Sequence, residues 1–349
     1  MSAWNIAIVG ATGQVGSALV ELLQEHCVQT DEAQTDSAQK HNFQIENLYL
    51  VGSDNSAGEI VRFAGKNLTV IDSAQMDWSQ CHFAFFVAGA KTSEKYAQIA
   101  TDSGCVVIDA SGYFATQDHI PLIVPKVNNN VLTEYRNDNI VAVASATVCQ
   151  LLRCVASLTD TELLTNLHAT SFIPASLYGK PGVDELAGQS ARLLNGMPVD
   201  NELFDKQLAF NLLPISHERD DATLGEKSQI NQIRKVLNNY DLPVSIESVV
   251  VPVFYGLSQA INVSSSLPIE LDMARFGEYG VEVQEGNLPT PVTEVSAESE
   301  SQLTIKLSNL RHSYGHYEQI QFWSVADNVR YLGALMLIET LEILINDYL

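Results

Sequence analysis

The sequence has few basic residues and lacks long apolar runs. Its 349 residues include 19 Lys and Arg against 42 Asp and Glu, which gives a formal net charge of −23. This charge repels phosphate backbones and anionic lipid head groups, so binding to nucleic acid or to a membrane surface is disfavoured. No run approaches the roughly 20 apolar residues that a membrane-spanning helix needs.

Cysteine is also scarce and scattered. The five cysteines are odd in number and show no CxxC spacing: Cys27, Cys81, Cys105, Cys149 and Cys154. This pattern excludes both a disulfide framework and a zinc site, and we expect no bound metal. The first Lys or Arg is Lys40, so we expect no secretory or organelle-targeting segment with a basic start. The sequence therefore predicts a soluble, cytoplasmic protein.

The first 140 residues alternate between short apolar runs and segments with helical spacing. The apolar runs have the length of strands and lie at 4–9, 47–52, 82–88, 105–109 and 139–145. Most of them are continuously apolar, as expected for strands that are covered on both faces. Alternation of this kind predicts an α/β fold with a doubly wound parallel sheet.

The remainder of the chain has a different texture. Longer strands are expected at 246–254 and 259–264, which favours an antiparallel or mixed sheet. The polar segments 28–44 and 285–301 are expected to be surface loops, whereas the leucines of 330–348 predict an amphipathic helix. At roughly 150 residues per domain, the chain length predicts two domains.

The N-terminal strand runs into a glycine-rich turn and then a helix. One glycine permits the tight turn, another lets backbone N–H groups approach a pyrophosphate, and a third packs helix against strand. The phosphates would lie at the positive end of the helix. The predicted dinucleotide-binding residues are Gly10, Thr12, Gly13, Gln14, Val15 and Gly16. The alternative is a glycine-rich turn that holds no ligand.

The end of the second predicted strand is expected to bind the adenine ribose. It carries Ser53, Asp54, Asn55 and Ser56. Asp54 can accept a hydrogen bond from a 2′-hydroxyl, and no neighbouring Lys or Arg is available for a 2′-phosphate. NAD and NADP are both possible cofactors, and NAD is favoured. The alternative is a polar loop in which Asp54 only caps a turn.

Six short motifs follow one another along the chain in an order that is typical of one family. They are VGATGQVG at 9–16, SAG at 56–58, IPLIVPKVN at 120–128, GKPGVDEL at 179–186, VPVFYGLSQA at 251–260 and WSVADN at 323–328. Their order resembles aspartate-semialdehyde dehydrogenase over essentially the whole length. The resemblance implies an enzyme that reduces β-aspartyl phosphate with NADPH through a cysteine acyl-enzyme and a histidine acid/base.

The resemblance also implies an architecture. Residues 1–140 with 325–349 would form a Rossmann-like NAD(P)-binding domain. Residues 141–324 would form a second, mixed-sheet α/β domain that supplies the interface of a homodimer.

The catalytic groups implied by the resemblance are absent from the matching positions. The nucleophilic cysteine falls on Ala146 and the acid/base histidine falls on Leu257. The carboxylate and phosphate arginines, the supporting glutamine and the nicotinamide-contacting asparagine fall on Val250, Ala115, Ile173 and Met336, respectively. A methyl group cannot replace a thiolate in covalent catalysis, and an isobutyl group cannot transfer a proton.

We therefore expect a catalytically incomplete member of the family, similar to its Usg-type paralogues, with a binding or regulatory role. It would retain the dinucleotide-binding fold and the dimer. A regulatory subunit that pairs with a different protein is a related possibility.

The alternative is an active NAD(P)-dependent semialdehyde oxidoreductase with an altered substrate. Its nucleophile would be Cys149, which lies about 4.5 Å along the helix axis from Ala146 on nearly the same face. His168 and His217 are expected to be a core histidine and a loop histidine rather than bases. Lys235 matches a family lysine only loosely and equally fits a surface position.

Overall fold

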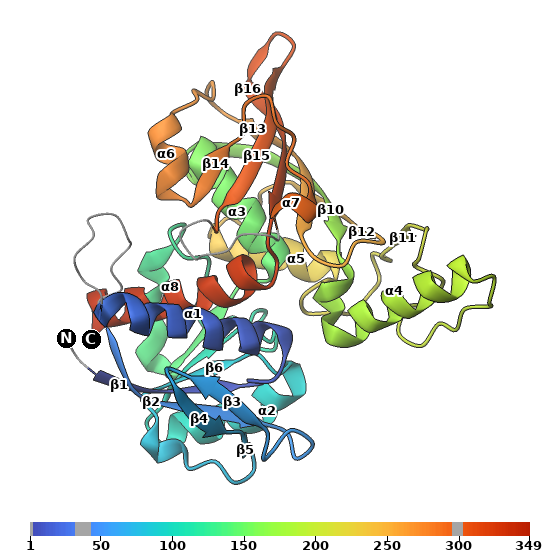
Figure 1. Cartoon of the computed structure of the whole chain (residues 1–349). Coiled ribbons are helices and arrows are strands. Elements are labelled where there is room, and N and C mark those ends of the chain that lie inside the picture. Colours follow the sequence, from blue (N-terminus) through green and yellow to red (C-terminus); the bar gives the residue numbers. More distant parts are fainter. Residues whose placement is uncertain (1–2, 32–42, 295–302) are drawn as a thin grey trace. The chain divides into compact units, whose positions relative to one another are not determined.

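The computed structural model describes residues 3–31, 43–294 and 303–349. The chain forms two compact units. The first contains the residues up to Ser145 and those from Gly333 onward, and the second contains the residues between Ala146 and Leu332. Figure 1 shows the elements of each unit along the colour gradient of the chain.

A seven-stranded parallel sheet forms the centre of the first unit, in the order β5-β2-β1-β6-β7-β9-β8 among the described residues. Its strands are β1 (Ala3–Val9), β2 (Gln44–Gly52), β5 (Ile71–Asp72), β6 (Phe83–Phe86), β7 (Val106–Asp109), β8 (Leu122–Ile123) and β9 (Ile140–Val143). All residues of β6 and β9 are buried, because helices cover both faces of the sheet. The predicted parallel sheet is confirmed.

Helices cover the two faces of this sheet. Helix α1 (Gln14–Asp31) connects β1 to β2, and α2 (Ala90–Asp102) connects β6 to β7. The two crossovers lead in opposite directions from the central β1–β6 pair, and crossovers of the usual right hand then place the two helices on opposite faces (Figure 1). Helix α8 (Met336–Ile343) packs on β7 and β9.

Smaller elements complete the first unit. A hairpin of β3 (Ile60–Phe63) and β4 (Lys66–Thr69) lies beside β2, and short 3-10 helices span Trp78–Gln80 and Asn129–Asn137. In the part of the chain that the structure describes, no helix is both long and apolar enough to cross a bilayer.

The second unit is built on a mixed sheet in the order β11-β12-β10-β13-β16-β15-β14. Its strands are β10 (Leu164–Ile173), β11 (Leu213–Pro214), β12 (Val244–Val250), β13 (Leu257–Ser265), β14 (Val281–Val283), β15 (Ile305–Ser313) and β16 (His316–Ala326). Strand β10 pairs in parallel with β12 and antiparallel with β13. The predicted second, mixed-sheet domain is confirmed.

Helix α3 (Ala146–Leu158) forms the core of the second unit. Every side chain after Ala146 is buried, because the helix contacts the sheet and also α5 (Glu226–Val236) and α6 (Met273–Glu278). The remaining elements of this unit are α4 (Gly179–Leu194), α7 (Pro291–Glu294) and 3-10 helices at Thr161–Leu163 and Ala175–Tyr178.

The C-terminal segment differs from the single amphipathic helix expected over 330–348. Helix α8 is flanked by wider π-helical turns at Arg330–Leu335 and Leu344–Tyr348. The leucines of the predicted stripe are all buried, and half of the residues between them are buried as well. The chain is therefore helical over most of the predicted segment, but the turns that flank α8 are π-helical rather than α-helical.

The units divide at slightly different places from those expected. Strand β16 continues through Ala326 in the second sheet, and residues up to Leu332 belong to that unit. The expected loop at 28–44 is shorter, because α1 continues through Asp31 and β2 begins at Gln44; residues 32–42 lie outside the described residues. Within 285–301, α7 is helical, and 295–301 also lie outside them.

Candidate functional site

The glycine-rich turn after β1 requires glycine for steric reasons. Gly10 has φ +95°, and a Cβ there would lie 2.9 Å from the Ala88 backbone. A Cβ on Gly16 would overlap the Gly10 carbonyl. Gly13 donates from its N–H to that carbonyl at 3.0 Å. These contacts match the tight turn and the close helix–strand packing that the sequence predicted.

A cavity of about 640 Å³ opens beside this turn. Gly10, Thr12 and Gly13 line it. Ser53, Asp54 and Ser56 line it from the loop after β2. The carboxyl ends of parallel strands meet at one edge of a sheet, which is where ligands bind in open α/β folds. Gln14, Val15, Gly16 and Asn55 are not among its lining residues.

Sequence reasoning missed part of this cavity. Asp72 lines it from the end of β5, and Thr92, Lys95 and Tyr96 line it from α2. A hydrogen bond with Tyr96 raises the pKa of Lys95, so the cavity contains a cation as well as carboxylates. The expectation that no cation lies near Asp54 considered only neighbours in the sequence. Lys95 is distant from Asp54 in the sequence, and the fold places both residues in the lining of one cavity.

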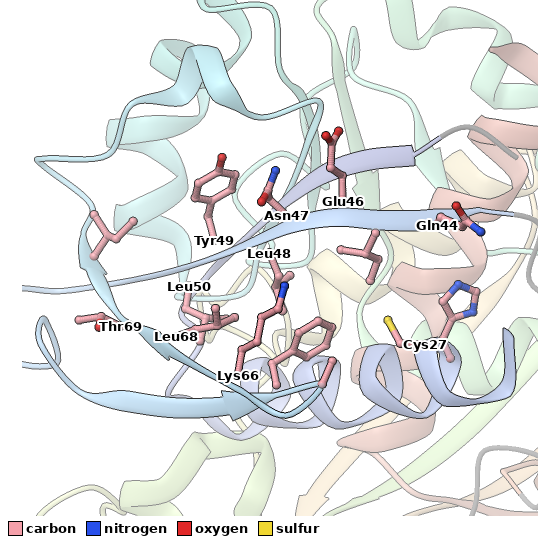
Figure 2. Close-up of a pocket in the computed structure, with 15 residues that line it drawn as sticks. Cys27, Gln44, Glu46, Asn47, Leu48, Tyr49, Leu50, Lys66, Leu68 and Thr69 are labelled. Carbon is pink, nitrogen blue, oxygen red and sulfur yellow. The ribbon is translucent and has the colours of Figure 1, made fainter. Parts of the chain in front are cut away.

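A separate cavity of about 560 Å³ lies in the same unit between β2, the β3–β4 hairpin and the end of α1. In Figure 2, the Lys66 side chain extends from the hairpin toward β2, with Cys27 near the α1 end. None of the residues predicted to bind the dinucleotide lines this cavity. Six of the ten residues predicted to bind the dinucleotide line the cavity beside the glycine turn instead.

A buried carboxyl group ends β7 in the first unit. Asp109 is fully buried and accepts hydrogen bonds from the Ser93 hydroxyl at 2.6 Å and the Ser111 hydroxyl at 3.0 Å. Burial raises its pKa to about 6, although these hydrogen bonds oppose the rise. Ala115 lies in the bend that follows and Met336 begins α8, and both are buried.

Three of the positions to which the resemblance assigns catalytic or substrate-binding groups meet at one end of the second sheet. Ile173, the last residue of β10, pairs with Val250, the last residue of β12. Leu257 begins β13 beside them, because Phe172 pairs with Ser258 in the antiparallel register. All three side chains are almost completely buried. This end of the sheet therefore carries an apolar cluster of Ile173, Val250 and Leu257.

Ala146 lies on the same face as this cluster. The Gln259 amide nitrogen donates to the Thr147 carbonyl and to the Ser171 hydroxyl, both at 3.0 Å. Side chains alternate along strands, so Leu257 and Ile173 share the face of Gln259 and Ser171, toward α3. The structure thus brings the nucleophile and acid/base positions implied by the resemblance to one face of one unit.

Neutral amides and hydroxyls form hydrogen bonds around the α3 face of this cluster and ahead of Leu257. Gln150 donates to the Ser324 hydroxyl at 2.9 Å across α3 and β16, and both residues are fully buried. Asn328 accepts from the Gly256 N–H at 2.9 Å and donates to the Ser176 hydroxyl at 2.9 Å. These hydrogen bonds hold the chain ahead of Leu257 in place, and none of these side chains carries a proton that titrates near neutrality.

The alternative reactive groups lie elsewhere. Cys149 is completely buried. His168 lies on the sheet face opposite Ser171, because strand side chains alternate, and His217 is exposed in a loop. His312 and His316 lie near the β15–β16 turn, at the far end of the strands from Leu257. Lys235 is half-buried in the last turn of α5. No described histidine of this unit lies beside Ala146.

Comparison with known proteins places this geometry in a family. A family model described as semialdehyde dehydrogenase, NAD binding domain, matches residues 5–135, and its dimerisation domain matches 155–331. A Vibrio cholerae protein named aspartate-semialdehyde dehydrogenase 2 is 35% identical over 352 residues, covering 99% of this chain and 98% of the relative. The chain belongs to the aspartate-semialdehyde dehydrogenase family.

Other members of the aspartate-semialdehyde dehydrogenase family are similar at comparable levels. A Pseudomonas aeruginosa protein named USG-1 protein homolog is 32% identical, covering 99% of this chain and 98% of the relative. The crystal structure of Vibrio cholerae aspartate semialdehyde dehydrogenase II superposes with a TM-score of 0.86 at 34% identity, covering 99% of this chain and 100% of that chain. The family assignment supports a nicotinamide dinucleotide as the cofactor of the first unit.

Proposed function

We propose that this chain is a catalytically incomplete member of the aspartate-semialdehyde dehydrogenase family that binds a nicotinamide dinucleotide and has a binding or regulatory role. The observation that carries the proposal is the apolar cluster beside Ala146. At the positions where the resemblance implies a thiol and an imidazole, the chain has the methyl group of Ala146 and the isobutyl group of Leu257.

The size of the catalytic loss follows from the chemistry. Covalent catalysis needs a nucleophile and a base within hydrogen-bond reach of each other. Removing either group in a covalent enzyme costs on the order of a million-fold in kcat. Cys149 is buried and no described histidine of the unit lies near it, so the arrangement favours inactivity over a relocated nucleophile.

An activity assay tests the proposal. Purified protein is mixed with phosphate, aspartate semialdehyde and either NAD⁺ or NADP⁺, and nicotinamide reduction is followed by absorbance. We expect no turnover above background, while the Vibrio cholerae relative serves as the positive control. Turnover that disappears in Cys149→Ala would replace the proposal with the active oxidoreductase.

The proposed cofactor is NAD rather than NADP. Asp54 and Asp72 both line the cavity beside the glycine turn, and two carboxylates oppose a 2′-phosphate more than the single Lys95 attracts it. Calorimetric titration of the whole chain with each dinucleotide tests this preference. Tighter binding of NADP⁺ would reverse the cofactor assignment, and binding of neither would leave the glycine turn without a ligand.

We further propose a homodimer. The match of residues 155–331 to a dimerisation domain supports it. The sheet face opposite α3 carries the half-buried rings of Phe172 and Trp323, whose centroids lie 5.4 Å apart.

Light scattering tests the oligomeric state. It should give twice 38.2 kDa for the chain and a lower mass for Phe172→Asp. Tyr314→Asp, at the tip of the β15–β16 hairpin, is the matched control and should leave the dimer intact. Co-purification from the native cell of a different protein in equal amount would favour a hetero-complex instead.

A further inference from the structure

A further cavity, of about 370 Å³, lies in the second unit at the β11 edge of the sheet. Its volume is within the range of small-molecule sites, which is about 300–1,000 Å³. Val250 forms part of its wall, and so do residues of the loop that follows α4 and of the loop that follows β11. No residue of the cluster other than Val250 lines it.

One side of this cavity is apolar. Val250 pairs with Leu213 across β12 and β11, and the Phe204 ring packs edge-on against Tyr178 with centroids 4.9 Å apart. The resemblance implies a carboxylate-binding arginine at the position of Val250. Its replacement removes a charge and leaves an apolar surface at this wall.

The other side carries an arginine that is already fixed in position. The Arg219 guanidinium donates from Nε and Nη2 to one carboxylate oxygen of Asp221, at 3.2 and 3.1 Å. The second oxygen of Asp221 accepts three hydrogen bonds of 2.9 Å from Thr223 and Leu224. Burial alone would raise the pKa of Asp221, but these hydrogen bonds and Arg219 lower it. Asp221 therefore remains ionised and orients the guanidinium.

The remaining edge of the guanidinium faces a weak partner. Nη1 of Arg219 lies 3.3 Å from the Tyr178 hydroxyl, which is a long hydrogen bond. The lining contains a second cation, Lys206, and one carboxylate, Asp205. The pairing carboxylate Asp221 is not part of the lining, so the groups that face the cavity carry a net positive charge within a strongly acidic protein.

We propose that this cavity binds a small carboxylate with a short apolar chain. The carboxylate would contact Arg219 and Lys206, and the chain would lie against Val250 and Phe204. The Arg219 guanidinium is already held by Asp221, so it loses little conformational freedom when a ligand binds. Hydrogen bonds between charged groups are also stronger than those between neutral groups. This cavity would give the proposed binding role a ligand class, and the significance of Val250 rests on that proposed function.

Titration of the full-length chain with 3-methylbutanoate, and with the neutral 3-methylbutanamide as matched probe, tests the proposal. We expect saturable binding of the acid and none of the amide over the same concentrations. Arg219→Gln should weaken binding of the acid at least tenfold. The control Arg311→Gln, which removes an exposed arginine of the β15–β16 hairpin, should leave it unchanged.

A second variant separates loss of the site from a disturbed loop. Leu203 is partly exposed at the rim, so Leu203→Trp should obstruct the cavity without touching the Arg219–Asp221 pair, and binding should fall. Equal binding of acid and amide, no binding of the acid, or equal effects of the two arginine variants would overturn the proposal. NAD⁺ titration and the turnover assay on the same samples report on the proposed function separately, because they depend on other residues.

Discussion

The two units differ in what occupies the ends of their central strands. In the first unit, the carboxyl ends of β1, β2, β5 and β6 carry glycine, serine and carboxylates around a cavity of about 640 Å³. In the second, the adjoining ends of β10, β12 and β13 carry Ile173, Val250 and Leu257, which are buried and apolar. A sheet edge can thus remain a polar cavity in one unit and become packed core in the other.

This difference shows why the fold of the chain and its chemistry must be argued separately. The family fold is present in both units, but fold alone does not specify a reaction. The polar cavity favours retained ligand binding, and the apolar cluster favours loss of proton transfer and covalent chemistry. Four substitutions test the two sides of this contrast.

Asp109 gives the largest expected effect, since the first unit buries an ionisable group where the cluster of the second has none. Its folded-state pKa of about 6 lies above the ordinary 3.8, so the folded state binds the proton more tightly. Its stabilisation is fully present below about pH 3.8 and is lost as the pH rises through 6.

Over that window the unfolding free energy should fall by about 3 kcal/mol from this group alone. Asp109→Asn removes the titration, so melting temperatures measured from pH 4 to pH 7 should show a flatter profile than wild type. Asp102→Asn, an exposed carboxylate of α2, is the control and should follow wild type. Identical profiles for all three proteins would contradict the raised pKa.

The glycine turn gives the next effect. Gly10 and Gly58 have similar positive φ angles of 95° and 89°, but only a Cβ on Gly10 meets other atoms. Both alanine variants suffer the backbone strain, so the difference between them measures the steric clash with Ala88. We expect Gly10→Ala to be less stable than Gly58→Ala by about 1–3 kcal/mol. It should also bind the dinucleotide more weakly; equal stability and affinity would contradict the described packing.

Ala146→Cys tests the second unit by placing a thiol where the family resemblance implies one. A cysteine there would begin α3, and a thiol at a helix N-terminus has a lowered pKa. Ala146→Cys should react with iodoacetamide at least tenfold faster than the buried Cys149 of wild type, a difference of about 1.4 kcal/mol in barrier. Mass spectrometry of labelled peptides identifies the modified residue. Fast labelling of Cys149 in the wild-type chain would favour the relocated nucleophile.

The smallest effect concerns cofactor choice. Asp54 is exposed in the cavity beside the glycine turn, where its charge is partly screened by solvent. Asp54→Ser should raise the affinity for NADP⁺ relative to NAD⁺ by about threefold to tenfold. Asp118→Ser, outside the cavity lining, should leave the ratio unchanged. A ratio that does not move in Asp54→Ser would remove this residue from cofactor selection.

The strands of the first sheet were predictable because continuously apolar runs indicate strands that are buried on both faces. Runs such as 83–86 and 140–143 are apolar throughout, and the corresponding β6 and β9 are fully buried. The π-helical turns that flank α8 were less predictable, since leucine spacing indicates a helix but does not distinguish π-helical from α-helical turns.

The candidate sites divide in the same way. The glycine turn can be recognised locally, because strand, turn and helix follow one another within residues 3–16. Lys95 and Asp72 could not be found that way, since separate crossovers bring them to the edge that holds Asp54. The meeting of Ala146, Val250 and Leu257 likewise depends on strand pairing, and only the family resemblance related them beforehand.

Helix α3 has a consequence for how such a chain can change over time. Its later positions are enclosed by neighbouring elements, so an exchange at any of them disturbs packing. Ala146 alone is half-exposed, and a swap there between a thiol and a methyl group leaves the architecture intact. A thiol at this first position of α3 can therefore be gained or lost by one substitution with little effect on folding, whereas the base that a thiolate needs depends on a separate position in β13.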